Sequence, residues 1–452
     1  MQSSTREILK IAVPVSLEMV VMLVLNFVNQ IIVGGLGPLA IAAVGFSNSL
    51  TFIVAVTIGA LGSSVGIMAS RAFGAQRTHE LNVTVTIALV MGGSVSGALV
   101  LFPSLFPQTT LTLAGASQTV AQTGAAYLQL VALSVVPAVL SGVLSSVLRA
   151  TDHPRSPMIA TFVTVILNTL LGYALVYGYG PFPELGIVGA GAATLFTASL
   201  KTVILWYQAF ALHRTNHINF PREKAEWLRV IKPLFVLAIP MGLTELVWTV
   251  GLYLYNVILQ RLGDLALASG QIATTLEGIF IVASMGLMSA AQMLVGRSIG
   301  AQDPTGAERW IKLTQQMAFR SSLIFAACYI AMSWALPVLF QNAGEDVRHG
   351  AVMYILLNAM FQPVRVRNMV LGGGVLPSAY DVRGIIYGDS IGALVVGVPL
   401  AAFFTFFTPI GLLGICLARG IDELAKLAVY SYRAKRINWH HVAQDHANER
   451  QD

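Results

Sequence analysis

The sequence is poor in charged residues, which make up only 11% of its 452 positions. Soluble globular proteins carry about 25% Asp, Glu, Lys and Arg. Apolar residues reach 56% here, and the mean hydropathy is +0.72. Because a chain of this composition cannot cover a surface that faces water, we predict that its outer solvent is lipid.

Cysteine and the motifs of soluble catalysis are scarce or missing. The two cysteines, Cys328 and Cys416, lie in separate apolar runs, which favours neither a disulfide framework nor a zinc site. The glycines at 372–374 are not followed by Gly-Lys-Ser/Thr, so the phosphate loop of an ATP-driven pump is absent from the sequence. No Ser/His/Asp or HExxH pattern is visible. The sequence therefore indicates neither an enzyme nor a resident metal.

Long apolar runs divide the chain into candidate membrane spans, each of which needs about 20 mostly apolar residues. The first run, at 11–33, is too long for the core of a signal peptide and shows no clear cleavage site. Twelve spans are predicted, at 11–33, 41–69, 81–103, 121–147, 157–178, 186–212, 233–260, 265–296, 313–339, 350–375, 384–407 and 411–432.

Basic residues set the predicted orientation. They concentrate in both tails and in the loops after the second, fourth, sixth and eighth spans, whereas the opposite loops contain little beyond Arg261 and Arg348. Because Lys and Arg favour cytoplasmic loops, we predict that both termini are cytoplasmic. The net charge of +6 is then a consequence of topology, and we expect no nucleic-acid partner.

The two halves of the chain repeat each other at an offset of 226 residues. Pro14 corresponds to Pro240, Arg71 to Arg297, and Gly-Ala-Gln at 74–76 to the same tripeptide at 300–302. Between positions 14 and 76, 19 of 63 pairs are identical without a gap. Six spans per half is an even number, so both halves enter the membrane from the same side.

This repeat predicts an all-α polytopic membrane protein whose twelve transmembrane helices form two parallel six-helix lobes. The lobes are expected to be related by a pseudo-two-fold axis along the membrane normal, with a site between them that rocking exposes to each side in turn. The segment 221–232 is expected to form a short amphipathic helix in the interface. The predicted divisions are a lobe at 1–212, a cytoplasmic linker at 213–232, a second lobe at 233–434 and a tail at 435–452.

Several segments together resemble the multidrug and toxic compound extrusion (MATE) transporters. They are Gly- and Ala-rich runs whose order, spacing and repetition carry the resemblance: 33–45, 183–193, 296–301, and Gln362-Pro363 with 368–374. The resemblance covers nearly the whole chain. It implies cation-coupled efflux of organic, often cationic, compounds by two six-helix lobes.

The sequence departs from that family's pattern at three places. The first span often carries Asp where this chain has Asn29, and the fifth often has Asp four residues after an Asn, where Asn168 is followed by Gly172. The turn after the tenth span reads Pro-Ser-Ala-Tyr-Asp at 377–381 in place of Arg-x-Gly-Gly-Asp. The aspartate site that some members have in the N-terminal lobe therefore does not carry over to this chain.

Three carboxylates lie inside predicted spans, where an unpaired charge costs about 3 kcal/mol on insertion scales. Glu18 follows Pro14 in the first span, Glu245 lies near the middle of the seventh and Glu277 near the middle of the eighth. Such a group can bind a proton or Na⁺ on one side of the membrane and release it on the other. We predict these three as coupling residues. The alternative for each is a protonated, structural carboxyl bonded to a nearby hydroxyl or carbonyl group.

Other charged residues inside the spans are interpreted as structural. Asp389 in the eleventh span is expected to pair with Arg365 or Arg367 of the tenth, and Lys201 is expected to extend toward the cytoplasm. An ion-pair ladder on one protein-facing side of the last helix is predicted from four residues at i, i+3, i+4 and i+7: Arg419, Asp422, Glu423 and Lys426.

Aromatic and amide side chains inside the spans are candidates for contacts with an organic substrate. Aromatic faces attract organic cations, and amides supply hydrogen bonds. The alternative for each aromatic residue is ordinary packing against protein or lipid. The predicted substrate-binding residues are Asn29, Gln30, Asn168, Trp248, Tyr255, Gln271, Phe280 and Gln292.

The leading functional hypothesis is a secondary active transporter. It would export organic, cationic drugs or metabolites by alternating access, in antiport with H⁺ or Na⁺ and without a cofactor. The alternative within transport is a flippase for a lipid or lipid-linked precursor, whose cavity would be expected to carry more cations than this carboxylate-containing interior. We predict a multi-pass monomer in the lipid bilayer of the plasma or inner membrane.

Overall fold

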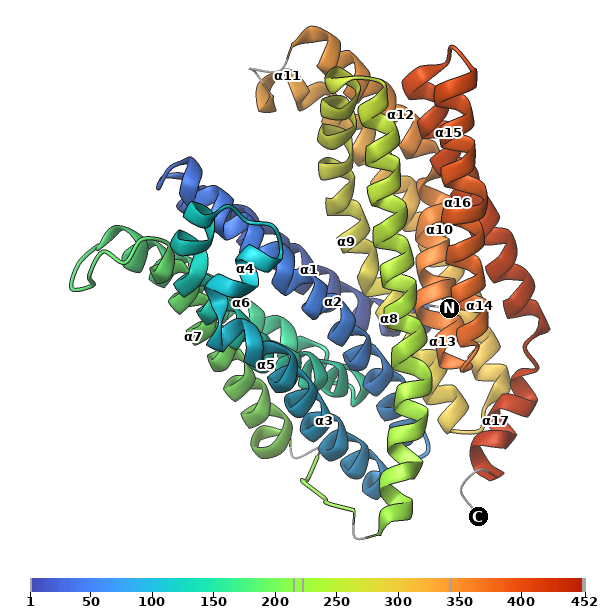
Figure 1. Cartoon of the computed structure of the whole chain (residues 1–452). Coiled ribbons are helices and arrows are strands. Elements are labelled where there is room, and N and C mark those ends of the chain that lie inside the picture. Colours follow the sequence, from blue (N-terminus) through green and yellow to red (C-terminus); the bar gives the residue numbers. More distant parts are fainter. Residues whose placement is uncertain (1, 214–215, 222, 341–343, 449–452) are drawn as a thin grey trace. The chain divides into compact units, whose positions relative to one another are not determined.

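The computed structural model describes residues 2–213, 216–221, 223–340 and 344–448, and the regular structure in these ranges is helical throughout (Figure 1). The chain forms two compact units. Leu17–Ala238 make up the N-terminal unit, and Met1–Ser16 with Ile239–Asp452 make up the C-terminal unit. The change from one unit to the other falls inside two long helices, α1 (Gln2–Gly34) and α8 (Lys224–Arg261).

The N-terminal unit is organised around α5, which packs against α2, α3 and α7. The buried face of α5 includes Tyr127 and Val131. Gly191 of α7 permits a close approach there, because a Cβ at this position would lie 3.2 Å from Tyr127 and Leu130. The helices of this unit, besides its parts of α1 and α8, are α2 (Pro38–Gly74), α3 (Thr78–Leu105), α4 (Pro107–Leu113), α5 (Gln118–Ala150), α6 (Arg155–Tyr177), α7 (Ile187–Trp206) and η1 (Tyr207–Leu212).

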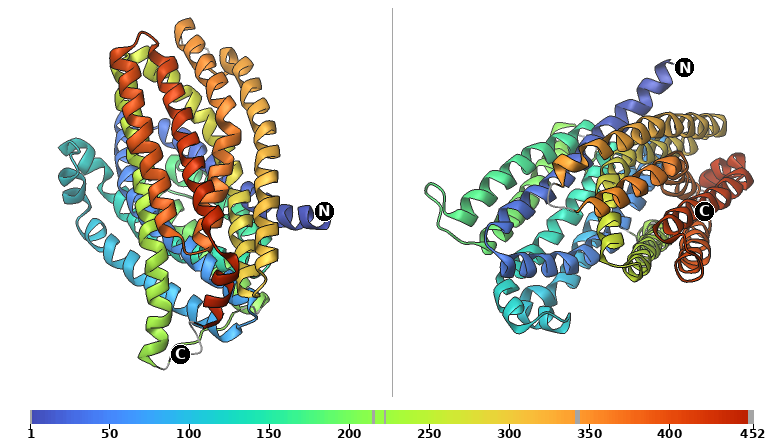
Figure 2. Two further views of the ribbon diagram at one scale, coloured as in Figure 1. Left: turned by 90° about the vertical axis from the view of Figure 1, so that its right-hand side faces the viewer. Right: turned by 90° about the horizontal axis from the view of Figure 1, so that it is seen from above.

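The C-terminal unit is organised around α12, which packs against α9, α10 and α16 (Figure 2). Its core includes Phe280, Tyr329, Tyr354 and Cys416. The helices of this unit, besides its parts of α1 and α8, are α9 (Asp264–Gly300), α10 (Pro304–Met332), η2 (Ser333–Ala335), α11 (Leu336–Leu339), α12 (Glu345–Asn368), η3 (Met369–Val375), α13 (Leu376–Ser378), α14 (Val382–Asp389), η4 (Ser390–Gly397), α15 (Val398–Phe407), α16 (Gly411–Arg436) and α17 (Trp439–Asn448).

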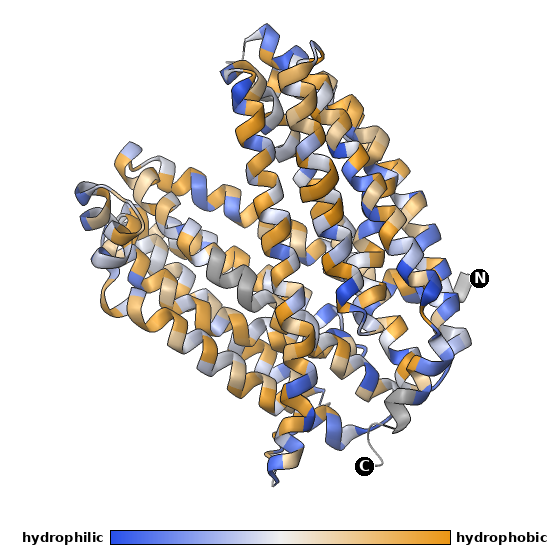
Figure 3. Ribbon diagram, turned by 45° about the vertical axis from the view of Figure 1, so that its right-hand side comes forward, coloured by the Kyte–Doolittle hydropathy of each residue, from blue (hydrophilic) through white to orange (hydrophobic). Residues whose placement is uncertain are grey.

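The twelve predicted spans are confirmed as helices. In the described part of the chain, nine helices are long and apolar enough to cross a membrane. The remaining three spans are α2, α12 with η3, and α16. Apolar residues cover most of the helices, and hydrophilic residues lie at the helix ends and at intervals along several helices (Figure 3). The amphipathic interfacial helix predicted at 221–232 is wrong as a separate element, because α8 begins at Lys224 and continues without a break.

The predicted repeat is visible in the backbone. Gly37 and Gly263, which precede α2 and α9, have φ of 99° and 102°. Gln76 and Gln302, which follow the same two helices, have φ of 55° and 57°. Positive φ is uncommon for a residue with a side chain. Its recurrence at an offset of 226 residues therefore shows that both halves turn in the same way.

Three π-helical segments lie within the described residues: η1, η3 and η4. Two of them directly follow a polar residue, since Asn368 precedes η3 and Asp389 precedes η4. π-Helical turns are rare and are frequently found at functional sites. The interior of the C-terminal unit is therefore a candidate functional region.

Candidate coupling and substrate sites

Glu18 lies in a buried group of charges in the N-terminal unit. A guanidinium nitrogen of Arg149 is 2.6 Å from Glu18 Oε2, and the ammonium group of Lys201 is 3.4 Å from Oε1. The hydroxyl of Thr161 donates a 3.1 Å hydrogen bond to the same Oε1. The Glu18 side chain is only 2% exposed. One buried carboxylate is thus held between two cations; we call Glu18, Arg149 and Lys201 the Glu18 cluster.

Glu277 of α9 also lies between two cations, in the C-terminal unit. Arg365 of α12 pairs with its Oε1, and Arg419 of α16 lies 3.3 Å from its Oε2. Arg419 also donates a 2.7 Å hydrogen bond to the hydroxyl of Tyr354. Arg365 forms a second ion pair, at 3.2 Å, with Glu423. Three helices of the core are therefore joined through one carboxylate.

The charged contacts continue along α16. Lys426 Nζ is 3.1 Å from Asp422 and 4.0 Å from Asp389 of α14. The hydroxyl of Tyr255, on α8, donates a 3.2 Å hydrogen bond to Asp422. These ion pairs form two groups on neighbouring turns of α16, one with Glu277, Arg365, Arg419 and Glu423 and one with Asp389, Asp422 and Lys426, and we call the two together the buried charge network.

Glu245 has different surroundings from the other two predicted coupling carboxylates. It lies within α8 and is exposed. In the part of the chain that the structure describes, no ion pair includes Glu245, whereas Glu18 and Glu277 each have two cationic partners. Tyr255, ten residues further along the same helix, donates a hydrogen bond to Asp422 of the buried charge network. The helix that contains Glu245 therefore contacts this network, but Glu245 does not take part in its ion pairs.

The predicted pairing of Asp389 with an arginine is wrong. Asp389 lies beside Lys426 and not beside an arginine, because the side chain of Arg367 bonds to Gln315 at 3.1 Å and Arg365 binds two glutamates. The predicted ladder on α16 is confirmed for the pair Asp422 and Lys426, while the ladder's other two members bind residues of other helices. Helical spacing identified the buried face but not which neighbouring helix meets it.

Lys201 also differs from its prediction. It was expected to reach the cytoplasm, yet its ammonium group pairs with Glu18 and its side chain is 15% exposed. Arg149 lies just after the fourth predicted span, among the basic residues that were expected on the cytoplasmic side, and its side chain is buried against the same carboxylate. A charge near the end of a span satisfies the positive-inside pattern even when it points inward, so sequence alone missed both contacts.

The predicted substrate residues have different surroundings within their own units. Asn168 donates a 2.8 Å hydrogen bond to Thr197 inside the N-terminal unit. Tyr255 donates a hydrogen bond to Asp422 of the buried charge network, and Phe280 packs in the core of the C-terminal unit. Gln292 is buried, and Asn29 is half-buried. The exposed candidates are Gln30, Trp248 and Gln271.

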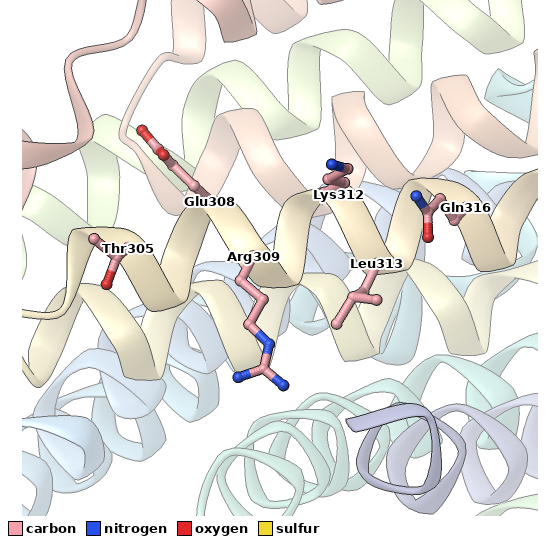
Figure 4. A pocket seen from close by; sticks show the side chains of 6 residues that line it. All are labelled: Thr305, Glu308, Arg309, Lys312, Leu313 and Gln316. Atoms are coloured by element: carbon pink, nitrogen blue, oxygen red, sulfur yellow. The ribbon is translucent and has the colours of Figure 1, made fainter. Parts of the chain in front are cut away.

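A surface groove of about 460 Å³ runs along the first turns of α10 (Figure 4). Glu308 and Lys312 project to one side of the helix in this view, and Arg309 projects to the other. Arg309 also donates a 2.6 Å hydrogen bond to Ser4 Oγ of α1. None of the predicted substrate or coupling residues lines this groove.

The sequence pattern of the MatE family matches residues 14–174 and 240–403. The two matched segments begin at Pro14 and Pro240, the pair that defines the repeat. The family match therefore covers most of both halves and supports the resemblance drawn from the glycine-rich runs.

Several relatives match nearly the whole chain over nearly their own full length. A FAD transporter of Shewanella oneidensis is 24% identical over 96% of this chain and 94% of its own. A probable multidrug resistance protein NorM of Bradyrhizobium diazoefficiens is 25% identical over 95% and 94%. The multidrug resistance protein NorM of Burkholderia vietnamiensis is 24% identical over 94% and 93%.

Solved structures agree with the fold. A crystal structure of a MATE protein in complex with MaL6 covers 97% of both chains with a TM-score of 0.87 at 18% identity. An outward-facing multidrug resistance MATE family transporter covers 97% of this chain and 96% of its own with a TM-score of 0.87 at 19% identity. These neighbours and relatives are transporters and not enzymes. The chain therefore belongs to the MatE family and is a multi-pass membrane transporter.

Proposed function

We propose that this chain is an antiporter that exports organic, cationic compounds in exchange for H⁺ or Na⁺ by alternating access. Two of the relatives above are named as multidrug resistance proteins, which supports the export of organic compounds. An antiporter also needs a group that binds the coupling ion within the membrane, and carboxylates inside spans are the usual means. The proposal rests mainly on the surroundings of Glu245.

Glu245 is an exposed carboxylate in α8, which is one of the helices long and apolar enough to cross a membrane. A charged group at the centre of a membrane helix costs about 3 kcal/mol on insertion scales. No cation of the described residues forms an ion pair with Glu245. A proton or a cation from outside the protein would remove this cost, so we assign the exchange of the coupling ion to Glu245.

Glu18 and Glu277 were also predicted to carry coupling, and their surroundings favour a supporting role. A proton or Na⁺ that binds either carboxylate has to displace a guanidinium or ammonium group already in contact. Breaking a buried ion pair of this kind is costly. We therefore propose that these two glutamates position helices and that Glu245 exchanges the ion.

The surroundings of Glu245 also fit a cationic cargo. Trp248 is three residues further along α8, on the same side of the helix, and is 42% exposed. A carboxylate and an indole ring in this arrangement attract an organic cation by charge and by cation–π contact. Cargo and coupling ion would then compete for the same negative charge, which is the basis of antiport.

Uptake of a fluorescent organic cation into everted membrane vesicles tests the proposal. We expect an imposed pH or Na⁺ gradient to drive uptake, and Glu245→Gln to lower it by about tenfold or more, the range of a typical coupling free energy. Glu345→Gln, which changes an exposed carboxylate in the first turn of α12, is the matched control and should transport normally. Gradient-independent uptake by the unaltered protein, or normal coupling in Glu245→Gln, would contradict the proposal.

A second cargo class is favoured by the relative from Shewanella oneidensis, which is named as a FAD transporter. If this chain carries a flavin dinucleotide, FAD will inhibit uptake of the fluorescent cation or will itself move with the gradient. Movement of a fluorescent lipid between leaflets would instead favour the flippase alternative. We further propose a monomer in the plasma or inner membrane with both termini on the cytoplasmic side, in agreement with the placement of the basic residues.

A further inference from the structure

The buried charge network does not balance. Its four carboxylates are Glu277, Asp389, Asp422 and Glu423, and its three cations are Arg365, Arg419 and Lys426. Full ionisation therefore leaves one negative charge inside the C-terminal unit. Because an uncompensated buried charge is strongly unfavourable, such a network is expected to take up one positive charge.

Asp389 is the least compensated of the four carboxylates. Its nearest cation is Lys426 at 4.0 Å, and the same ammonium group lies closer, at 3.1 Å, to Asp422. Glu277 and Glu423 instead pair with guanidinium groups. The Asp389 side chain is 19% exposed, the largest exposed fraction in the network, so a proton can reach it.

The ionisable groups that face Asp389 come from two helices. From α16 they are Lys426, Asp422, Glu423 and Tyr430, and from α8 the group is Glu245. The other elements packed on α14 are α13, η3 and η4, whose sequences contain no ionisable side chain. Among these charges, Lys426 is therefore the only cation that can neutralise Asp389 within the described residues.

Close packing in this region requires glycine at two positions. A Cβ at Gly388 would overlap the ring of Tyr430, and a Cβ at Gly392 would overlap the Lys426 side chain. The backbone of α14 and η4 thus lies directly against α16. The π-helical segment η4 begins at the residue after Asp389, and such segments are frequent at functional sites.

Gln362 supplies a separate sign of an unfilled polar site in this interior. It is 0% exposed, and neither of its amide atoms has a hydrogen-bond partner. It precedes Arg365 of the buried charge network by three residues on α12. A buried amide in this state usually bonds to ordered water. Water beside the network would give protons a route through the C-terminal unit.

We propose that Asp389 is a second coupling site, at which a proton binds and leaves during the antiport cycle proposed above. When the proton binds, an O–H bond forms on a carboxylate oxygen of Asp389, and the ammonium group of Lys426 stays charged and pairs with Asp422. When the proton leaves, Lys426 is again shared by both carboxylates. Na⁺ fits this position less well, because it would lie beside the positive charge of Lys426.

Ion pairs and a hydrogen bond connect Asp389 to α8, the helix that contains Glu245. Asp422 accepts a hydrogen bond from Tyr255, which lies on α8 together with Glu245. A shift of Lys426 between its two carboxylates therefore changes the charge presented to α8.

The experiment compares Asp389→Asn with Asp346→Asn, which makes the same change at an exposed residue in the first turn of α12. In liposomes with equal pH on both sides, we expect Asp346→Asn to exchange a fluorescent organic cation at the rate of the unaltered protein. With an imposed pH gradient, Asp389→Asn should lose about tenfold or more of the driven uptake. Asp389→Glu, which keeps an ionisable carboxyl group, should retain it.

Thermal unfolding as a function of pH gives a second readout that does not depend on transport. Asparagine balances the network, so Asp389→Asn should fold and should lose part of the decrease in unfolding temperature that the unaltered protein shows as pH rises. Unaltered driven uptake in Asp389→Asn would overturn the inference, and so would failure of this variant to fold. If the unaltered protein shows no driven uptake, antiport itself fails, and the unfolding curves alone decide the role of Asp389.

Discussion

In the N-terminal unit one carboxylate, Glu18, is enclosed by two cations, whereas in the C-terminal unit four carboxylates share three cations. The Glu18 cluster therefore has a surplus of positive charge, and the buried charge network has a surplus of negative charge. A carboxylate with two cations has no need of a proton. The network does need one, and this difference is why we propose that ion exchange takes place in the C-terminal unit.

The two halves kept the same backbone and diverged in charge. The turns before α2 and α9 have nearly equal φ angles, at Gly37 and Gly263. The position that corresponds to Glu18, by contrast, holds Thr244, and the nearest carboxylate is Glu245 one residue later. One residue turns a side chain by about 100° around a helix of 3.6 residues per turn. The duplication therefore preserved a scaffold on which each unit acquired its own charges.

The largest expected effect comes from removing one arginine from each unit. Arg365→Met takes a cation from two carboxylates, Glu277 and Glu423, and deepens the negative surplus of the network. Breaking a buried ion pair by removing one partner typically costs about 3–5 kcal/mol. Arg149→Met leaves Glu18 with Lys201, one carboxylate with one cation, so its loss should be smaller. Thermal unfolding of the purified variants in one detergent measures both effects.

Arg383→Met is the control for these two variants, because Arg383 is exposed at the start of α14 and lies outside both groups of charges. It should unfold at the temperature of the unaltered protein. Equal losses in Arg365→Met and Arg149→Met would mean that the surplus of charge does not distinguish the units, and the comparison would no longer hold.

Sequence patterns predicted the helices and the repeat because both depend on local or periodic features. The apolar runs predicted twelve spans, and the 226-residue offset reappears in the φ angles of Gln76 and Gln302. Ion-pair partners were predicted poorly. Arg149 and Glu18 are 131 residues apart in the chain, and no local pattern links them.

The interior of the C-terminal unit shows the same limit. Helical spacing correctly predicted a polar, protein-facing side of α16, and the pair Asp422 and Lys426 is four residues apart on it. The partners of Arg365 depend instead on how α9, α12 and α16 pack against one another. Such contacts follow from tertiary packing, which a single sequence does not display.

A smaller effect is expected at two matching helix starts. Asp303, the N-cap of α10, accepts a 2.8 Å hydrogen bond from the Gly306 N–H, whereas the corresponding N-cap of α3, Arg77, forms no such bond. Asp303→Ala should lower the free energy of unfolding by about 1 kcal/mol. Arg77→Ser should raise it by a few tenths or more, because Glu80 at the third helical position would complete a capping box. Denaturation of each variant against the unaltered protein tests this.

The cap on α10 also predicts a pH dependence. The hydrogen bonds from the Gly306 N–H and from Thr305 lower the pKa of Asp303. Its contribution to stability is therefore fully present above the ordinary pKa of Asp, about 3.9, and is lost as pH falls through the lowered value. Asp303→Asn, which keeps an N-cap acceptor, should remove this acid sensitivity. An acid sensitivity equal to that of the unaltered protein would contradict the assignment.

The smallest expected effect concerns the residue after the last span of the N-terminal unit. The His213 ring lies on that of His153, with centroids 3.9 Å apart, and Ser156 Oγ is 3.0 Å from His213 Nε2. Burial, and then the neighbouring His153, lower the pKa of His213. The folded protein therefore binds this proton less readily than the unfolded chain, so stability is present above the ordinary His pKa and declines as pH falls below it.

The residue of the C-terminal unit that corresponds to His213 is Trp439, which does not titrate. Trp439 follows the last span and is buried at the start of α17. His213→Gln should therefore remove a small acid-induced loss of stability, less than about 0.5 kcal/mol since water screens a surface pair. Trp439→Phe should leave the shape of the pH curve unchanged. Unfolding temperatures measured from neutral to mildly acidic pH decide this, and an unaltered curve in His213→Gln would show that the histidine pair does not contribute.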